Sequence, residues 1–596
     1  MTVLERAASD TLMTASDAIV RVLEGEGVRY LFGIPGAHVL PLYDAVGRSG
    51  RLEAVLTRHE GGAAYMARMY ARATTFPGVC IGTAGPGAGN LVTGVADAFA
   101  ENVPMIVLTG QVAGPIFGRH AAQEATGEYG IPDQVSMYKS ITRHSVCVHR
   151  PDQVVARLRE AFRIALTPPY GPVHVSIPVD IQAADVKFEE IPPAGYRIVH
   201  SRCLDPDAVS RIAGRLMRSK RPAIIVGKRA VLPWAGHEIQ KLMDAMGIPV
   251  ATTAVAKGMV DESHPMALGT LHLFGHRLPD RYLYESDCII AVGEGFDEYS
   301  SNYFEEELLP KQHLIQIDSN PTEIGRIYQV ADATTGNIPR ILQGLLQELE
   351  KRSWQCPTAL KQVVSALKKK SNYFSEPEMD SNAVPIKPQR FYRDLAEAAG
   401  EDVVIQADMG QNFFWGLRYF KASPRRYFAG WGWMPMGSGV AGAIGLSYGL
   451  PGKRICCVCG DGAMQMNGME VAVAAENNLP VTWVVFNDQR LNMVHMAQGM
   501  SYGERYNATT MQNPDFSQWA RSFGLREYRI EKPEETVQVL KEAFSGDGPS
   551  LVDLVIDGDE ILPIKPRAIL LAQKTGLKIA DSRVAAKAFR KVLDER

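Results

Sequence analysis

Short apolar runs alternate with amphipathic stretches along the whole of this 596-residue chain. Apolar runs of strand length, bounded by Gly or Pro and separated by helix-like stretches, predict βαβ units and parallel sheets. The runs that show this pattern are Gly78–Gly82, Met105–Thr109, Val173–Ile177, Ala223–Val226, Cys288–Val292, His313–Ile317, Val403–Ile405, Arg454–Val458 and Thr482–Phe486. The predicted fold class is therefore α/β.

Two polar stretches with several prolines, Phe188–His200 and Lys368–Gln389, are predicted to be linkers between domains. At roughly 100–200 residues per domain, the chain has room for three or four domains. The linkers separate parts at 1–190, 200–355 and 385–575, and a basic, helix-like tail follows at 576–596. We therefore expect three doubly wound parallel-sheet domains of similar size.

Charge and composition exclude several classes of protein. The formal net charge of −3 comes from 63 basic and 66 acidic residues, which favours neither nucleic acid nor an anionic membrane as a partner. We find no signal-sequence pattern and no apolar run near the roughly 18 residues of a membrane span. Cys456, Cys457 and Cys459 lie in one apolar run, and we interpret them as reduced thiols of a buried strand. A cytoplasmic location is expected.

The strongest local motif joins the end of a strand to the start of a helix. The run Arg454–Val458 leads into Gly460-Asp461-Gly462, and the run Thr482–Phe486 ends at Asn487-Asp488. Glycines let backbone N–H groups approach a phosphate at a helix N-terminus, and adjacent parallel strands bring their carboxyl ends together. Hard oxygen ligands beside phosphate suit Mg²⁺. The glycine motif alone could be an ordinary βαβ turn capped by Asp461, but the Asn-Asp pair favours a metal site.

A second acidic position lies in the first third of the chain. Glu60 begins a predicted helix directly after the strand Ala54–Leu56. A single glutamate there is usually an acid favoured by the positive end of the helix dipole. Its surroundings indicate more than that, because they read LTRHEGGAAYMARMYARATTFPGVCIGTAGPGAGNLVTGVADAFAENVPMIVLTGQV.

This segment resembles the acetolactate synthase branch of the thiamine-diphosphate-dependent enzymes nearly position by position through Gln111. Four further segments are similar to that family: FGIPGAHVLPLYDA, DMGQNFFWG, WMPMGSGVAGAIG, and the GDG motif with its Asn-Asp pair. The resemblance implies pyrimidine-binding, central and diphosphate-binding domains at 1–190, 200–355 and 385–575. It also implies thiamine diphosphate and Mg²⁺ as cofactors.

The resemblance assigns roles to individual residues. Glu60 would bond N1′ of the cofactor's aminopyrimidine, which requires a carboxyl group that shares a proton near neutral pH. Asp461 and Asp488 would bind Mg²⁺ through their side chains, and Arg490 would bind it through its backbone carbonyl. The residues expected to contact thiamine diphosphate are Gly36, Ala37, Glu60, Gly410, Gln411, Asn412, Met434, Met436, Gly460, Asp461, Gly462, Ala463, Asp488 and Met493.

The activity implied by the resemblance is carboligation, in which a 2-oxo acid is decarboxylated and its acyl carbanion is transferred to a second carbonyl compound. His38 and Gln123 join Glu60 as candidate catalytic residues, and Met493 and Gln498 are further candidates for substrate contact. A decarboxylase or a C–C lyase or hydrolase with the same cofactor is the alternative. A non-catalytic homologue is disfavoured, because Glu60 and the metal acids are present. Each cofactor bridges two chains in this family, so a homodimer or a dimer of dimers is expected.

Four departures from acetolactate synthases limit the substrate prediction. Ala122 and Ala497 replace a Phe and a Trp, so either a bulkier acyl donor or acceptor could fit or a rearranged loop could fill the space, and Arg143 replaces a Lys. The middle part lacks the glycine cluster, and around Phe296-Asp297 the arginine pair, with which those enzymes hold a non-redox FAD. Because a dinucleotide diphosphate would find few charge-assisted partners, we expect no FAD. The Rossmann-like pattern there is then a structural relic.

Overall fold

The computed structural model describes residues 11–199, 204–232, 234–309, 313–565 and 580–594. The chain forms two compact units, and each is described by itself. The first unit comprises residues 1–201, 432–451 and 469–477, and the second comprises residues 202–431, 452–468 and 478–596.

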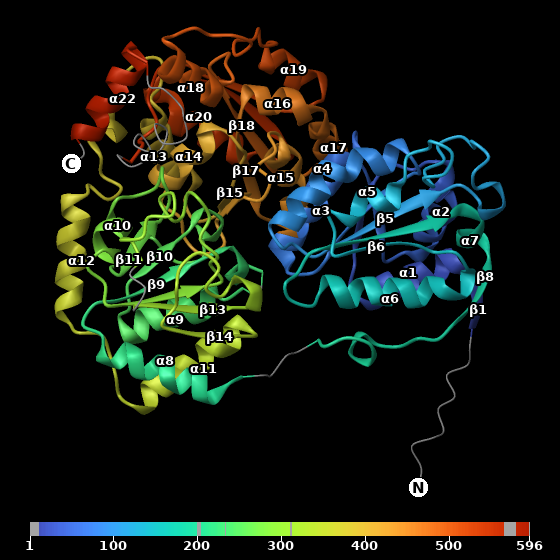
Figure 1. Ribbon diagram of the computed structural model, residues 1–596. Helices are drawn as coiled ribbons and strands as arrows, with labels where there is room; N and C mark the ends of the chain where they lie inside the picture. The colour runs from blue at the N-terminus through green and yellow to red at the C-terminus, as the bar shows by residue number, and fades with distance from the viewer. Residues whose placement is uncertain (1–10, 200–203, 233, 310–312, 566–579, 595–596) are drawn as a thin grey trace. The chain divides into compact units, whose positions relative to one another are not determined.

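The first unit is built on a six-stranded parallel sheet in the order β3-β2-β4-β5-β7-β6 (Figure 1). Its strands are β2 (Tyr30–Gly33), β3 (Glu53–Leu56), β4 (Gly78–Gly82), β5 (Met105–Gln111), β6 (His144–Cys147) and β7 (Pro172–Pro178). Every residue of β4, β5 and β7 is buried, as expected for parallel strands covered by helices on both faces. An antiparallel pair, β1 (Thr11–Thr14) and β8 (Asp185–Phe188), adds a separate short ribbon.

Helices cover both faces of this first sheet. They are α1 (Ala15–Gly25), α2 (Leu40–Ser49), α3 (Glu60–Thr74), α4 (Pro86–Ala100), α5 (Gln134–Lys139), α6 (Val154–Ala165) and α7 (Val179–Ala183). Apolar side chains of α1, α2 and α6 join those of the strands in one core. Helices α3 and α4 pack against each other, and α3 is buried almost throughout.

Two helices from late in the sequence belong to the first unit: α15 (Ser438–Gly449) and α17 (Val471–Glu476). Helix α15 packs along α3, and every residue from Ser438 to Ser447 is buried. Glycines make this approach very close: a Cβ at Gly445 would lie 2.1 Å from the Met66 carbonyl oxygen. Helix α15 therefore packs closely because its glycines lack side chains, and not because it has an amphipathic pattern.

The second unit holds a six-stranded parallel sheet in the order β11-β10-β9-β12-β13-β14. Its strands are β9 (Pro222–Val226), β10 (Val250–Thr252), β11 (Ala267–Thr270), β12 (Cys288–Val292), β13 (Leu314–Asp318) and β14 (Asp332–Thr335). The accompanying helices are α8 (Pro206–Arg218), α9 (Gly236–Met246), α10 (Leu278–Leu283), α11 (Ile338–Lys351) and α12 (Ala359–Lys370). In chain order the strands run third, second, first, fourth, fifth, sixth, which is the Rossmann arrangement.

A second parallel sheet of this unit has the order β16-β15-β17-β18-β20-β19. Its strands are β15 (Val403–Ala407), β16 (Tyr427–Ala429), β17 (Arg454–Gly460), β18 (Val481–Asn487), β19 (Arg526–Ile530) and β20 (Ser550–Val555). Its helices are α13 (Pro388–Ala399), α14 (Gln411–Tyr419), α16 (Asp461–Asn467), α18 (Asn492–Tyr502), α19 (Phe516–Ser522) and α20 (Thr536–Ser545). Counted along the chain, this strand order equals that of the first sheet.

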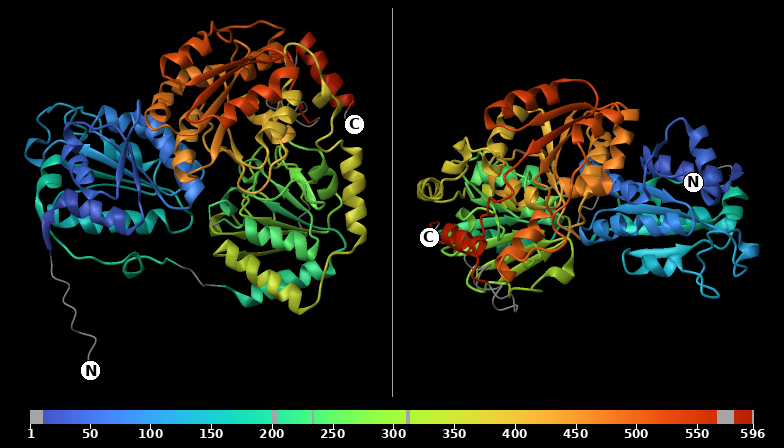
Figure 2. Two further views of the ribbon diagram at one scale, coloured as in Figure 1. Left: turned by 180° about the vertical axis from the view of Figure 1, so that it is seen from behind. Right: turned by 90° about the horizontal axis from the view of Figure 1, so that it is seen from above.

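The predicted α/β fold with three doubly wound parallel sheets is confirmed, and each predicted strand is present. Most have the predicted ends or ends extended by one or two residues, whereas the predicted strand His313–Ile317 is shifted by one residue to Leu314–Asp318. The predicted tail contains helix α22 (Arg583–Asp594), drawn in red, which packs against α18 (Figure 2). Residues 576–579 of that tail lie outside the described residues. The domain boundaries stay predictions.

Both predicted linkers are shorter than expected. Phe188 is the last residue of β8, where it pairs with Thr11. Lys368 to Lys370 form the last turn of α12, and Pro388 begins α13. In the second stretch, the lysines and the proline belong to helix ends, because lysines favour the negative end of a helix and proline suits its first turn.

The cysteine prediction agrees with the structure: Cys456, Cys457 and Cys459 are buried free thiols of β17. Burial raises the pKa of all three thiols, which keeps them protonated. Among the helices in the described segments, none combines the length and the hydropathy that a membrane crossing requires.

The close contact of α15 with α3 predicts that Gly445→Ala destabilises the protein. The added Cβ would overlap the Met66 carbonyl oxygen, and overpacking of this kind costs about 1–3 kcal/mol. We expect a lower thermal unfolding midpoint by calorimetry. Gly47→Ala, in α2, is the matched control because no atom lies within 4 Å of its added Cβ. Equal midpoints for the two variants would contradict the close helix contact.

Candidate active site

Glu60 is the first residue of α3, and its side chain is buried. His59 caps the helix, because its Nδ1 accepts the Gly61 N–H at 3.0 Å. Asn90, on α4, donates its amide to Oε2 of Glu60 at 2.9 Å. The other oxygen, Oε1, lies beside Gly87, where a Cβ would come within 3.2 Å of it. Asn90 thus holds Oε2 of the Glu60 carboxyl group, while Oε1 faces the backbone of Gly87, which carries no side chain.

The turn that follows β4 gathers further predicted residues beside Glu60. Thr83 lies beside Gly87, the glycine next to Glu60. A Cβ added at Gly36 would lie 2.6 Å from Thr83 Cβ. The Thr83 hydroxyl lies 3.4 Å from Nδ1 of His38, whose ring is also hydrogen-bonded by Gln123. Burial lowers the pKa of His38, which favours the neutral imidazole. The first unit therefore brings Gly36, His38, Gln123 and Glu60 together.

A buried acid that the sequence analysis missed supports this site from behind. Glu470 accepts the backbone N–H groups of Arg58 at 3.1 Å and of His59 at 2.8 Å. Burial raises the pKa of Glu470 to about 7, and the charge of Glu60 contributes to this rise. A Cβ at Gly62 would lie 2.3 Å from Oε1 of Glu470, so a side chain at position 62 would displace this carboxyl group. Glu470 thus fixes the two residues that precede Glu60.

Met434 and Met436 lie in the turn before α15. The Trp433 N–H in that turn donates to Oδ1 of Asp97 at 3.0 Å. Asp97 is itself paired with Arg68 at 3.1 Å, and both side chains are fully buried. Met434 has a left-handed backbone with φ 57 and is 40% exposed, whereas Met436 is half-buried. The buried ion pair therefore anchors the turn while Met434 remains accessible.

In the second unit, the predicted diphosphate residues lie at the carboxyl ends of β15 and β17. Gly410 precedes α14 and has φ 153, a conformation that favours glycine. The Asn412 amide donates to the carbonyls of Asp408 and Val458, each at 2.8 Å, and so ties the two strand ends together. Gly460 is the N-cap of α16 and is followed by the buried residues Asp461, Gly462 and Ala463. This edge therefore presents two glycine-rich helix starts.

Asp461 and Asp488 follow the neighbouring strands β17 and β18, as predicted. Burial raises the pKa of Asp488 to about 7, and the charge of Asp461 adds to the rise. Burial also raises the pKa of Asp461. A cation between them would relieve this repulsion. The described residues contain no group of three or more His, Cys, Asp or Glu that could hold a metal, so a cation here would need carbonyl and phosphate oxygens as well.

A chain of amides orients Asp461. The Asn513 amide donates to Oδ2 of Asp461 at 2.7 Å and to Oδ1 of Asn487 at 2.8 Å. The Asn487 amide donates in turn to Oδ1 of Asp553 at 2.8 Å. Oδ2 of Asp461 also accepts the Gln489 N–H at 2.8 Å. One carboxylate oxygen of Asp461 is thus fixed from two sides.

Other predicted residues have structural contacts. The Gln498 side chain accepts the Asn507 N–H at 2.8 Å and donates to its carbonyl at 3.1 Å, so it holds a loop in place. Met493 is half-buried against the core of the second unit. Arg490 pairs with Asp559 at 2.6 Å, and its N–H donates to Oδ1 of Asp488 at 3.1 Å. Gln411 contacts Met496.

Sequence reasoning missed Thr83, Asn90, Glu470 and Asn513. Asn90 and Glu470 could have been noticed as polar residues within otherwise apolar helical stretches, GAGNLV and GMEVAV. Nothing in the sequence near Asn513 indicates its link to Asp461, which lies 52 positions earlier.

Comparison with known proteins defines the class. Models of the thiamine pyrophosphate enzyme family match the N-terminal TPP-binding domain at residues 13–137, the central domain at 209–345 and the C-terminal TPP-binding domain at 408–554. The chain belongs to this family and is a thiamine-diphosphate-dependent enzyme.

The chain is also similar to individual members of the family. The probable acetolactate synthase large subunit of Methanocaldococcus jannaschii is 36% identical over 580 residues, which cover 93% of this chain and 94% of that protein. The acetolactate synthase large subunit of Corynebacterium glutamicum is 34% identical, with coverage of 93% and 88%. The isozyme 2 large subunit of Escherichia coli is 31% identical, with coverage of 93% and 98%. The predicted resemblance to the acetolactate synthase branch is confirmed.

Proposed function

We propose that the protein is a Mg²⁺-dependent carboligase that decarboxylates a 2-oxo acid and transfers the acyl unit to a second carbonyl compound. The observation that carries the proposal is the buried Glu60 carboxyl group, with Oε2 held by Asn90 and Oε1 facing Gly87. The relatives named acetolactate synthase large subunits support the same class of reaction.

Two observations indicate that the residues present fit the cofactor. Helices α14 and α16 both begin next to glycines, whose backbone a ligand can approach closely, and the buried carboxyl groups of Asp461 and Asp488 repel each other. The residues that would hold the pyrimidine are Gly36, Ala37, Glu60, Met434 and Met436. Those that would hold the diphosphate are Gly410, Gln411, Asn412, Gly460, Gly462 and Ala463, with Met493 beside the cofactor. Asp461, Asp488 and the Arg490 carbonyl would hold Mg²⁺. When bound, thiamine diphosphate supplies the electron sink for decarboxylation.

The chain's own residues perform proton and positioning roles. With the cofactor bound, Glu60 would exchange a proton with the aminopyrimidine through Oε1, and Asn90 keeps the carboxyl plane fixed through Oε2. His38, as a neutral imidazole bonded to Gln123, can donate a hydrogen bond to a substrate carbonyl oxygen through the ring nitrogen that carries its proton. The glycines around Thr83 let backbone lie close to Glu60, because a Cβ at Gly87 would come within 3.0 Å of Thr83 Cγ2 and 3.2 Å of Glu60 Oε1.

The substrates are proposed to be bulkier than those of acetolactate synthases. Ala122 and Ala497 stand where those enzymes have Phe and Trp, and both alanines are exposed in their own units. An exposed small side chain at such a position restricts a ligand less than an aromatic ring would.

A homodimer or a dimer of dimers is proposed as the active form. Large apolar side chains near the site residues of each unit are exposed, which marks an interaction surface. In the first unit they are 40–58% exposed at Leu40, Leu56, Trp433, Met434 and Met469. In the second unit they are 62% exposed at Met466 and 51% at Val494.

The reaction outcome separates this proposal from a decarboxylase or a C–C lyase or hydrolase. We expect 2-oxo acids supplied in pairs to give coupled products by mass detection, with cross-products when the two acids differ. Single acids should give only the self-coupled product. Free aldehyde as the only product would replace the carboligase proposal with the decarboxylase.

Glu60→Gln should keep cofactor binding and lose proton exchange. A carboxamide preserves the shape but cannot share the proton, so exchange of the thiazolium C2 proton, measured by NMR, should slow by about 10²–10⁴-fold. Glu53→Gln, at the exposed first residue of β3, is the control and should exchange normally. Normal exchange in Glu60→Gln would remove Glu60 from this role.

Asn513→Ala should weaken cofactor binding through the metal. Loss of the amide removes one of the two hydrogen bonds that fix Asp461 Oδ2, and loss of such an outer partner typically weakens metal affinity by about 10–100-fold. Calorimetry of thiamine diphosphate with Mg²⁺ present measures this change. The exposed neighbour Gln512→Ala should bind normally. Equal affinities for the two variants would show that the amide chain does not orient the metal acid.

A further inference from the structure

The central sheet of the second unit has a crevice where ligands of Rossmann-like sheets bind. The strand order reverses between β9 and β12, and ligands of such sheets lie outside the carboxyl ends of the strands at this point. The loop after β9 begins with Gly227, and the loop after β12 contains Glu294. A dinucleotide diphosphate would have to pass next to the first of these loops.

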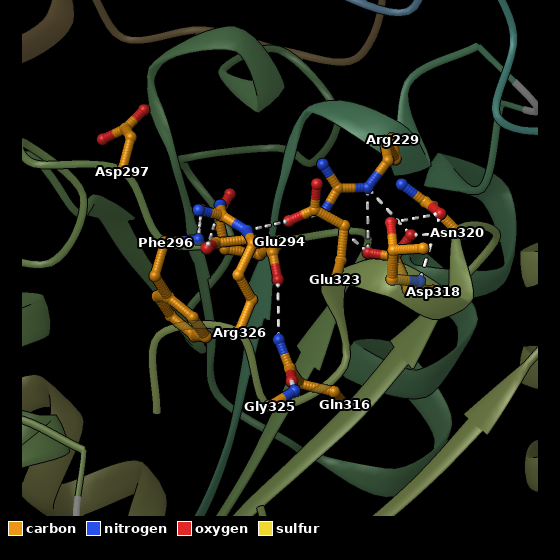
Figure 3. Close-up of polar contacts among 12 residues, drawn as sticks. Arg229, Glu294, Phe296, Asp297, Gln316, Asp318, Asn320, Glu323, Gly325 and Arg326 are labelled. Carbon is orange, nitrogen blue, oxygen red and sulfur yellow. Dashed lines mark hydrogen bonds and ion pairs between the residues drawn. The ribbon is translucent and has the colours of Figure 1, made fainter. Parts of the chain in front are cut away.

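The Glu294 side chain already occupies this position (Figure 3). A Cβ at Gly227 would lie only 2.2 Å from Oε2 of Glu294. Oε1 accepts the Phe296 N–H at 2.6 Å and the Ser300 hydroxyl at 3.2 Å. Oε2 accepts the Thr253 hydroxyl at 3.2 Å. A backbone N–H and two hydroxyls around one carboxyl group form the kind of donor set that otherwise holds an oxyanion.

The nearby guanidinium groups are engaged by acids of the chain itself. Arg229 binds Asp318 with two nitrogens, Nε at 2.8 Å from Oδ1 and Nη2 at 2.8 Å from Oδ2, and both side chains are buried. Arg326 binds Glu323 at 2.9 Å and the Gly295 carbonyl at 3.0 Å (Figure 3). These cations therefore already have anionic partners, and a diphosphate would have to displace them.

The remaining space is small and disfavours additional negative charge. The cavity at this edge measures about 60 Å³, room for roughly four to six waters. Pockets for drug-sized ligands measure about 300–1,000 Å³, and a flavin dinucleotide is larger than such ligands. Burial and the charge of Asp297 raise the pKa of Glu294 to about 7. The crevice therefore already disfavours the negative charge of this carboxyl group.

We propose that this crevice is filled from within: the Glu294 carboxyl group is an internal ligand that takes the donors a bound phosphate would use. The residues present do not fit FAD, and the central domain holds no flavin. Removing the Glu294 side chain creates a site for a small carboxylate, such as formate, on the Phe296 N–H and the Thr253 and Ser300 hydroxyls. This inference stands apart from the proposed reaction.

The test uses the full-length enzyme and two probes. Wild type, denatured after purification, should release no flavin absorbance, and FAD should neither shift its thermal midpoint nor bind by calorimetry. Glu294→Ala should melt at a lower temperature, because the Phe296 N–H loses its acceptor and the Thr253 and Ser300 hydroxyls keep only their long bonds to the Val226 and Asp297 carbonyls. Sodium formate should restore at least half of that loss in Glu294→Ala, whereas sodium chloride at equal concentration should not.

Two controls make the result decisive. Glu307→Ala removes an exposed glutamate of the same region and should show neither the loss nor a response to formate. If Glu294→Ala does not fold, Glu294→Gln takes its place; the amide keeps the shape, so it should melt near wild type and ignore formate. Flavin released by wild type, FAD binding to wild type, or an equal formate response in all variants would overturn the proposal.

Discussion

The packing of α15 against α3 is the constraint on which the first half of the site depends. Three glycines of α15 make it possible: a Cβ would lie 2.7 Å from Met69 Cγ at Gly442, 2.1 Å from the Met66 carbonyl at Gly445, and 2.6 Å from Ala73 Cβ at Gly449. Glu60 begins α3, and the turn with Met434 and Met436 leads directly into α15. The close contact between α15 and α3 therefore fixes the starting points of two site segments that are distant in sequence.

Buried charges divide into two kinds according to whether they are neutralised locally. Arg68 meets Asp97 and Glu101 at 3.1 and 2.7 Å, and Arg229 meets Asp318, so these groups hold loops in place. Asp461 and Asp488 have amide partners but form no ion pair with a buried cationic side chain among the described residues, and their pKa values rise. Buried acids with perturbed pKa values mark functional positions more often than paired ones do. Burial also raises the pKa of the paired Asp97 to about 6, so the contrast lies in the cationic partner that Asp461 and Asp488 lack among the described residues and that a metal ion would supply.

The features predicted correctly from the sequence are those that depend on residues close together along the chain. The strands followed from apolar runs bounded by Gly and Pro, and the meeting of Asp461 with Asp488 followed from the adjacency of strands in a βαβ unit. The helix start at Glu60 was also predicted correctly. The supports from Asn90, Glu470 and Asn513 were not, because each joins residues that only tertiary packing brings together. Glu294 likewise reads as one acid in a loop until Gly227 is placed against it.

The first and last sheets share one strand order, yet their loops carry different chemistry. In the first sheet the acid follows the second strand of the chain, at Glu60; in the last, acids follow the third and fourth, at Asp461 and Asp488. The same strand order therefore carries its acids on different loops in the two sheets, so the loops and not the order of the strands determine which edge handles protons and which could hold a cation.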